Sequence, residues 1–289
     1  MLFPVQNLLP ENFPRCLTEI PKPPTSLTYR GALPSQHLKL LAVVGSRRYS
    51  TYGKQVVDHL IDGLKGCDVG IVSGLALGID SLAHEAALRN NLYTMAVPGS
   101  GIADSVIYPA RHKGLAQRIL QHGGSLLSEF DPTFTATKWS FAQRNRIMAG
   151  ITHATLVVEA TEKSGTLITA RLATDYNREL LVVPGNIFSQ NTAGPHQFLK
   201  LGAIPVTHAD DILYALGLDP ENKPKPPTLF DTTLTPEEQI IIQALAQPQE
   251  TDELIRRSNL PAHEVNALLM QMEMKGLIAC ENNLYRRTS

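Results

Sequence analysis

The sequence predicts an α/β protein: an extended Rossmann-like, doubly wound, mostly parallel sheet, followed by a small winged-helix domain. Three observations lead to this prediction. Short apolar runs rich in β-forming residues alternate with amphipathic helical patterns from Leu40 onward. The runs lack polar alternation, which is typical of strands covered on both faces. A proline-rich stretch then leads into about 55 residues whose pattern indicates three helices and a hairpin.

Four segments follow from this pattern. Residues 1–38 are rich in proline and predict a lead-in with at most short elements. Residues 39–218 carry the alternating strands and helices of the sheet domain. Residues 219–233 are rich in proline and charged residues and predict a linker. Residues 234–289 form the predicted winged-helix domain.

Each element has its own signal in the sequence. The predicted strands of the sheet domain are 40–45, 69–74, 92–99, 125–130, 155–160, 179–185 and 203–207, and the predicted helices are 52–64, 80–90, 114–122, 141–150, 165–178 and 210–217. In the C-terminal domain, Thr235 and Glu238 have capping-box spacing and begin a helix. Thr251 and Pro261 begin two more helices, and Asn282–Asn283 mark the turn of the closing hairpin.

Composition excludes several classes of protein. Hydrophobic residues make up 43% of the 289 residues and charged residues 18%, which is typical of a globular protein. Basic and acidic side chains nearly balance, 26 against 27, so a histone-like polycation is excluded while local basic pockets are not. The three cysteines form no CxxC pair, and no apolar run could span a bilayer. We expect a cytoplasmic protein with no membrane partner, metal or cofactor.

The loop after the first predicted strand is Gly45-Ser46-Arg47. A glycine at this place lets the backbone approach a phosphate, and the next helix start supplies amide donors. Neither G-x-G-x-x-G nor G-x-x-x-x-G-K-[ST] is present, which disfavours a bound dinucleotide and a P-loop ATPase. Arg47 suits a phosphodiester; the alternative is an arginine that only covers the end of the sheet.

The second strand ends at Ser73 and Gly74, and Asp80 is placed as the N-cap of the following helix. His84 lies four residues further on. We interpret the Asp80–His84 pair as an ordinary i,i+4 helix contact rather than as acid–base machinery.

The predicted helix 141–150 and the residues before it combine cations with aromatic rings. The residues concerned are Lys138, Trp139, Phe141, Arg144, Asn145 and Arg146. Guanidinium groups bind phosphates and aromatic faces stack on bases, as a single strand requires. The alternative is that the aromatic rings pack the domain while one arginine pairs with Glu129 or Asp131.

A third loop, Lys163-Ser164-Gly165, again joins a strand end to a helix start. Because carboxyl ends of parallel strands meet at one edge, the three loops should converge there. We expect one positively charged pocket lined by Arg47, Arg144, Arg146 and Lys163, with Arg171 as a further candidate. No catalytic residue is predicted, since G-x-S-x-G and H-E-x-x-H are both absent.

With the motifs GSR, SGLALGID, RNRIMAG, VVEATEKSGTLITA and VVPGN in this order, residues 40 to about 216, together with the winged-helix tail, resemble the DNA-processing protein A (DprA or Smf) family. The resemblance implies a non-catalytic homodimer that binds single-stranded DNA. It also implies contact with single-strand-binding protein and loading of RecA during natural transformation (competence). The candidate DNA-binding residues are Gly45, Ser46, Arg47, Ser73, Gly74, Arg144, Asn145, Arg146, Lys163, Ser164 and Gly165.

The sequence departs from the family pattern at three places. His112 stands where the family has asparagine, and Ala142 stands where proline is usual. The N-terminal SAM-like domain of many members is missing or vestigial in residues 1–38.

Two other functions are considered. Nucleotide phosphoribohydrolases share a related sheet, but their P-G-G-x-G-T-x-x-E signature is not found, and Ser164-Gly165-Thr166-Leu167-Ile168 lacks its glutamate. A transcription factor would need a basic winged helix, whereas residues from Leu234 onward carry eight acidic and five basic side chains. That balance favours a protein-contact or autoregulatory role for the tail.

Overall fold

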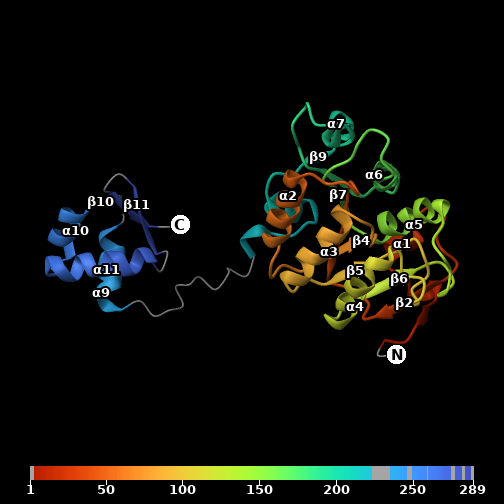
Figure 1. Cartoon of the computed structure of the whole chain (residues 1–289), viewed down its shortest axis with the longest axis horizontal. Helices are drawn as coiled ribbons and strands as arrows, with labels where there is room; N and C mark the ends of the chain where they lie inside the picture. The colour runs from red at the N-terminus through yellow and green to blue at the C-terminus, as the bar shows by residue number, and fades with distance from the viewer. Residues whose placement is uncertain are drawn as a thin grey trace. The chain divides into compact units, whose positions relative to one another are not determined.

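The computed structural model describes residues 3–222, 235–245, 249–258, 260–274, 277–281 and 284–287. The chain divides into two compact units, Met1–Pro224 and Lys225–Ser289 (Figure 1). Most of the predicted linker, residues 223–233, and the predicted turn at Asn282–Asn283 lie outside the described residues. Within the described part of the chain, no helix is both long and apolar enough to cross a membrane.

A mostly parallel, nine-stranded sheet forms the centre of the first unit among its described residues. Its strands are β1 (Gln6–Leu8), β2 (Leu27–Gly31), β3 (Lys39–Val44), β4 (Val69–Ser73), β5 (Thr94–Ala96), β6 (Ser125–Ser128), β7 (Ala154–Val157), β8 (Glu179–Val182) and β9 (Ile204–Pro205). The strand order is β1-β2-β6-β5-β4-β3-β7-β8-β9. Pairing is antiparallel for β1–β2 and β2–β6 and parallel elsewhere. The order reverses at β3, which lies between β4 and β7, and ligands of doubly wound sheets bind at such a point.

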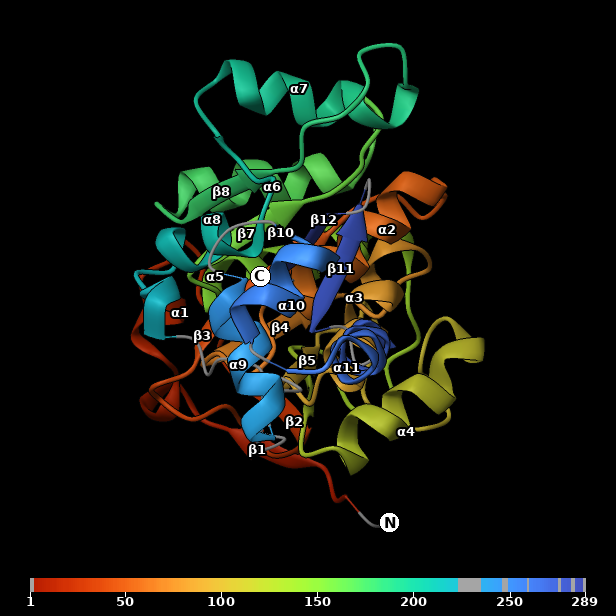
Figure 2. The same ribbon diagram turned by 90° about the vertical axis from the view of Figure 1, so that its left-hand side faces the viewer.

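Helices cover both faces of this sheet. They are α1 (Arg15–Thr18), α2 (Thr51–Asp62), α3 (Ile79–Arg89), α4 (Lys113–Gln121), α5 (Lys138–Ile151), α6 (Thr166–Asp175), α7 (Ala193–Lys200) and α8 (Ala209–Ala215). Leu41 and Val43 of β3 pack in the core formed with α2, α3 and α8, whereas Leu40 and Val44 pack in the core formed with α1, α5 and α6. Side chains on both faces of the strand are therefore buried, which explains why the apolar runs are continuous. Figure 2 shows α7 and β8 at one end of the unit and β1 and β2 at the other.

The proline-rich lead-in contributes its short elements to the sheet. Strand β2 pairs with β6, with Thr28 opposite Ser128, and Leu17 of α1 is fully buried in the core under α5. Prolines lie at the ends of these elements, as Pro14 does at the N-cap of α1. The strands between them keep their amide donors, so proline does not prevent pairing.

The second unit contains α9 (Pro236–Ala244), β10 (Gln249–Glu250), α10 (Thr251–Ser258), α11 (Ala262–Met274), β11 (Ile278–Glu281) and β12 (Leu284–Arg287). The predicted capping box is confirmed, because the Glu238 amide donates to Thr235 Oγ1 and the Thr235 amide donates to Glu238 Oε2. Leu269 and Met272 of α11 are buried in the core of this unit. Three helices and a three-stranded sheet in the order β10-β12-β11 among the described residues form the winged helix.

The turns after β3 and β4 pack backbone against backbone. Gly78 has a φ of +88°, and a Cβ there would collide with the carbonyl oxygen of Ser46. The amide of Ile79 donates to that same oxygen at 3.1 Å. A Cβ on Gly45 would lie 2.6 Å from the Ile79 side chain. Glycine is therefore required at both turns for this close approach.

We predict that Gly78→Ala lowers the free energy of unfolding by about 2–4 kcal/mol, because a left-handed φ and a backbone collision add together. Urea unfolding followed by circular dichroism measures the change. Gly114→Ala is the matched control, because a Cβ added at Gly114 in α4 would meet no atom within 4 Å beyond its own helix backbone. It should stabilise the protein by about 0.5 kcal/mol through helix propensity. Equal stability of Gly78→Ala and the unchanged protein would contradict the packing described.

Candidate functional site

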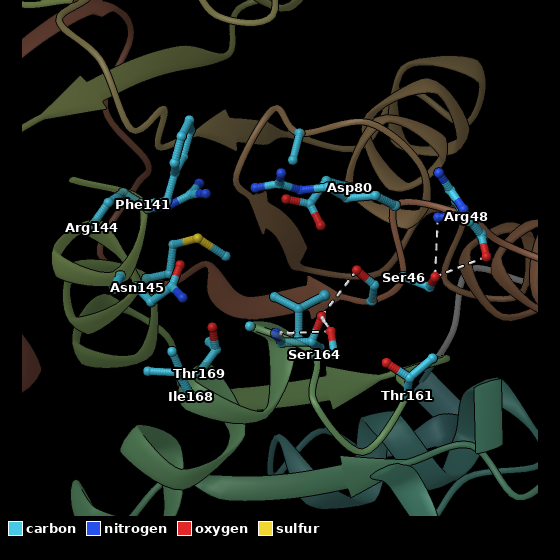
Figure 3. Close-up of a pocket in the computed structure, with 18 of the residues that line it drawn as sticks. Ser46, Arg48, Asp80, Phe141, Arg144, Asn145, Thr161, Ser164, Ile168 and Thr169 are labelled. Atoms are coloured by element: carbon cyan, nitrogen blue, oxygen red, sulfur yellow. Dashed lines mark hydrogen bonds between the residues drawn. The ribbon is translucent and has the colours of Figure 1, made fainter. Parts of the chain in front are cut away.

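A pocket of about 900 Å³ lies where the loops after β3, β4 and β7 meet the first turns of α5. In Figure 3, Phe141, Arg144 and Asn145 of α5 face Ser46 and Arg48 across this pocket. The predicted convergence of three loops at one sheet edge is therefore observed. Of the predicted DNA-binding residues, those that line the pocket are Gly45, Ser46, Arg47, Arg144, Asn145, Ser164 and Gly165.

The other predicted residues are placed elsewhere. Ser73 is fully buried and its hydroxyl donates to the Val43 carbonyl at 2.6 Å, and Gly74 packs behind the pocket. Arg146 does not line the pocket: its guanidinium pairs with Glu129, the alternative that the sequence left open. Lys163 is exposed but is outside the pocket lining.

The expected set of pocket cations therefore changes. Arg146, Lys163 and Arg171 are absent from the described lining, whereas Arg48 and Lys138 join Arg47 and Arg144 there. Arg146 lies about 200° around α5 from Arg144, and its ion pair with Glu129 holds its guanidinium outside the lining.

Several lining residues carry a weaker sequence signal. Tyr108 comes from the long loop after β5, and Gln190 and Asn191 come from the loop after β8. In neither loop does a glycine-containing turn lead directly from a strand end to a helix start, which is the pattern that predicted the loops after β3, β4 and β7. For the loop that carries Asn191, the sequence offers only the VVPGN motif, which marks the end of the preceding strand.

Arg47 lies beside two aromatic rings, Phe141 and Tyr108, in the lining of the pocket. The Arg47 guanidinium carbon lies 5.3 Å from the centroid of the Phe141 ring, within cation–π range. The Tyr108 ring is 5.6 Å from Phe141 and is half exposed. A cation that binds phosphate thus lies beside ring faces that can stack on bases.

Arg144 forms the floor of the pocket. It is 5% exposed and donates to the Val97 carbonyl, while its guanidinium lies where a Cβ on Gly74 would be. Burial lowers the pKa of Arg144 to about 10, against the opposing effect of Asp80. Burial raises the pKa of Asp80, and the charge of Arg144 and the amides of Gly74 and Ala76 oppose that shift. Arg144 therefore holds the β4 turn in addition to its place in the lining.

The helix starts around the pocket are largely occupied by the protein's own acceptors. At α2, Glu159 accepts from the amide of Ser50 at 2.9 Å and from its hydroxyl. At α6, the amide of Thr166 donates to Ser164 Oγ at 3.2 Å. These amides are bonded to the protein's own acceptors and are not free to cradle a phosphate, so the side-chain cations of the lining are the candidate anion-binding groups.

Asp80 is not the N-cap predicted from the sequence. Helix α3 begins at Ile79 with Gly78 at its N-cap, and Asp80 lies one residue inside, where Oδ2 accepts from the amide of Gly74 at 3.0 Å. His84 has no exposed surface, and its Nδ1 lies 2.7 Å from Thr94 Oγ1. The predicted Asp80–His84 contact is replaced by these separate partners.

His84 is buried beside Thr94. The Thr94 hydroxyl lies 2.7 Å from His84 Nδ1 and donates to the Ile71 carbonyl at 2.9 Å. Nε2 is buried and has no hydrogen-bond partner in the described structure. Burial, with a smaller contribution from His112, lowers the pKa of His84 to about 3. The imidazole is therefore neutral and structural.

We predict that His84 makes the protein acid-sensitive. In the unfolded chain this histidine takes up a proton below pH about 6.5, whereas in the folded protein it does so only near pH 3. The free energy of unfolding therefore falls as the pH falls between these values. The resulting loss between pH 7 and pH 5 is about 2 kcal/mol. The free energy of unfolding, measured with urea at pH 7 and at pH 5, should therefore differ by about 2 kcal/mol less in His84→Gln than in the unchanged protein. An unchanged difference would contradict a buried neutral imidazole.

Comparison with known proteins agrees with this architecture. The family model of DNA recombination-mediator protein A matches residues 6–217, and that of the DprA winged helix domain matches residues 223–282. The sequence is 37% identical to Protein Smf of Escherichia coli (strain K12), over 98% of this chain and 78% of that protein.

Two solved structures are similar. DNA processing protein A (DprA) from Streptococcus pneumoniae superposes with a TM-score of 0.67 at 38% identity, over 73% of this chain and 74% of that one. A structure of DNA processing protein A from Helicobacter pylori, solved for its single-stranded DNA binding mode, gives a TM-score of 0.65 at 29% identity, over 74% of this chain and 96% of that one. With the matches to both family models, these similarities show that the chain belongs to the DNA recombination-mediator protein A family of DNA-processing proteins.

Proposed function

We propose that the protein is a cytoplasmic, single-stranded-DNA-binding recombination mediator that acts without catalytic turnover. The observation that carries this proposal is the Arg47–Phe141 pair, 5.3 Å apart, at the centre of an open pocket in a chain of net charge −1. In a nearly neutral chain, a pocket lined by four basic side chains is a local concentration of positive charge. The Helicobacter pylori relative, described by its single-stranded DNA binding mode, supports the same ligand.

The pocket favours a single strand over a duplex. Phe141 and Tyr108 offer ring faces, and only unpaired bases expose a face for stacking. Arg47, Arg48 and Lys138 supply phosphate contacts that do not depend on base identity. Binding should therefore show little sequence preference and fall steeply with salt.

The finer parts of the proposal follow from the family. As a recombination mediator, the protein would displace single-strand-binding protein and load RecA onto incoming DNA during natural transformation. It would do so as a homodimer.

We predict that Arg47→Ala weakens binding to single strands of any sequence by about tenfold and makes the log–log salt slope about 0.7 less negative, because one phosphate contact is lost. The measurement is fluorescence anisotropy of a labelled oligo-dT and of a matching duplex at two salt concentrations. Lys163→Ala should weaken binding less, since Lys163 lies outside the pocket lining.

Arg118→Ala is the matched control for charge, because Arg118 pairs with Glu85 on the helix surface outside the pocket. It should leave affinity and salt slope unchanged. Absent or equal binding to single strand and duplex would contradict the proposal. Release of free base from nucleoside monophosphates would then favour the nucleotide-hydrolase alternative.

We predict that the protein accelerates RecA assembly on DNA already covered by single-strand-binding protein. The DNA-stimulated ATPase of RecA measures the lag before assembly. The lag should shorten with this protein and lengthen again with Arg47→Ala, whose pocket binds the strand less well. An unchanged lag in the presence of tight strand binding would remove the RecA-loading part of the proposal only.

A further inference from the structure

Trp139 is a large exposed apolar side chain beside the pocket. It is the only tryptophan in the sequence and is 55% exposed. It lies in the first turn of α5, directly after the pocket-lining Lys138, but it does not itself line the pocket. Burying the indole would be favourable, and tryptophan is enriched at binding interfaces because its ring is apolar and its N–H is polar.

The indole is held in place by two phenyl rings. Its centroid is 5.7 Å from those of both Phe130 and Phe134, at interplanar angles of 80° and 59°. The two phenyl rings stack on each other at 4.7 Å. Neither ring lies parallel on the indole, so neither takes the stacked position that a base would occupy. The capping box between Thr137 and Ser140 fixes the helix start that carries Trp139.

Helix geometry places Trp139 next to the pocket. Successive residues turn by about 100°, so position 139 is about 60° around the helix from position 142. Ala142 and Lys138 both line the pocket, which makes the Trp139 position its immediate neighbour on α5.

The acidic groups near this position are already engaged. Glu129 is nearly buried and accepts from Arg146 and from Gln143 Nε2. Asp131 is exposed, and its Oδ1 accepts from the amide and the hydroxyl of Thr133. A base stacks on the face of the indole, so stacking does not require a net charge at this position. Lys138, the preceding residue, is the nearby cation that can contact a phosphate.

We propose that Trp139 is a second stacking subsite, on which a base of the single strand stacks after the strand leaves the pocket past Phe141 and Lys138. This inference rests on the proposed function. It extends the bound strand beyond the pocket along the start of α5 and predicts that the length of strand bound exceeds what the pocket alone holds.

Tryptophan fluorescence of the full chain tests the contact directly, because Trp139 is the only indole. The titrants are oligo-dT strands of about 4 and about 16 nucleotides, a range typical of single-strand sites. The long strand should quench the emission, with saturation at the same ratio of DNA to protein as the anisotropy signal. The short strand, held in the pocket, should quench less.

Two variants separate stacking from packing. Trp139→Leu should lower affinity for the long strand by about tenfold, the loss expected for one base–aromatic stack, and should leave the short strand unaffected. Trp139→Phe is the matched control that retains a ring and should stay within about twofold of the unchanged protein. Urea unfolding of both variants checks that the Phe130–Phe134 pair still packs.

The outcomes distinguish this inference from the proposed function. Tight binding of the long strand with no quenching, and with Trp139→Leu at full affinity, would overturn the second subsite and leave the pocket as the DNA site. No binding of either strand would overturn both. Quenching by the long strand together with a selective loss in Trp139→Leu would support both.

Discussion

The geometry of the site depends on one buried carboxylate. Glu159, 1% exposed at the end of β7, accepts hydrogen bonds at the start of α2 from Ser50 and, at 3.5 Å, from Asn191 of the loop after β8. Its backbone oxygen accepts from Ser46 at 2.7 Å. One residue thus joins three loops at the point where the strand order reverses. Removing one partner of such a buried hydrogen bond leaves the other unsatisfied, which costs about 1–3 kcal/mol.

This arrangement separates the charges that build the pocket from those that face solvent. Glu159 fills the positive end of α2, and Arg144 is buried against Gly74 and the Val97 carbonyl. Glu159 accepts only from groups of the protein, and Arg144 donates to the Val97 carbonyl while its buried Nε has no partner among the described residues. Arg47 and Arg48, carried by the loop that Glu159 anchors, remain exposed. The buried Glu159 and Arg144 therefore hold the shape of the pocket, whereas the exposed Arg47 and Arg48 are available to a ligand.

The sequence predicts the sheet well and the site in part. All seven apolar runs from Leu40 onward contain strands. For the central strands, burial on both faces leaves a signal that does not depend on tertiary detail, whereas β9 is a two-residue exposed strand. Helix α7 was missed because Gly194 and Pro195 mask its periodicity. In the site, glycine-rich turns located the loops correctly. Which of two neighbouring arginines enters the pocket, Arg144 or Arg146, depends on an ion pair with a distant loop, and the sequence left that open.

The pairing of β2 with β6 bears on how the protein assembles during synthesis. Thr28 and Ser128 are hydrogen-bonded although 100 residues separate them. Strand β2 therefore leaves the ribosome long before its partner, and its polar backbone edge stays open in the meantime. Pro24 and Pro34 flank it and lack the amide donors that a foreign strand would need to extend the ladder. The prolines of the lead-in therefore confine any pairing with a neighbouring chain to the short strand between them until β6 arrives, and they do not prevent it.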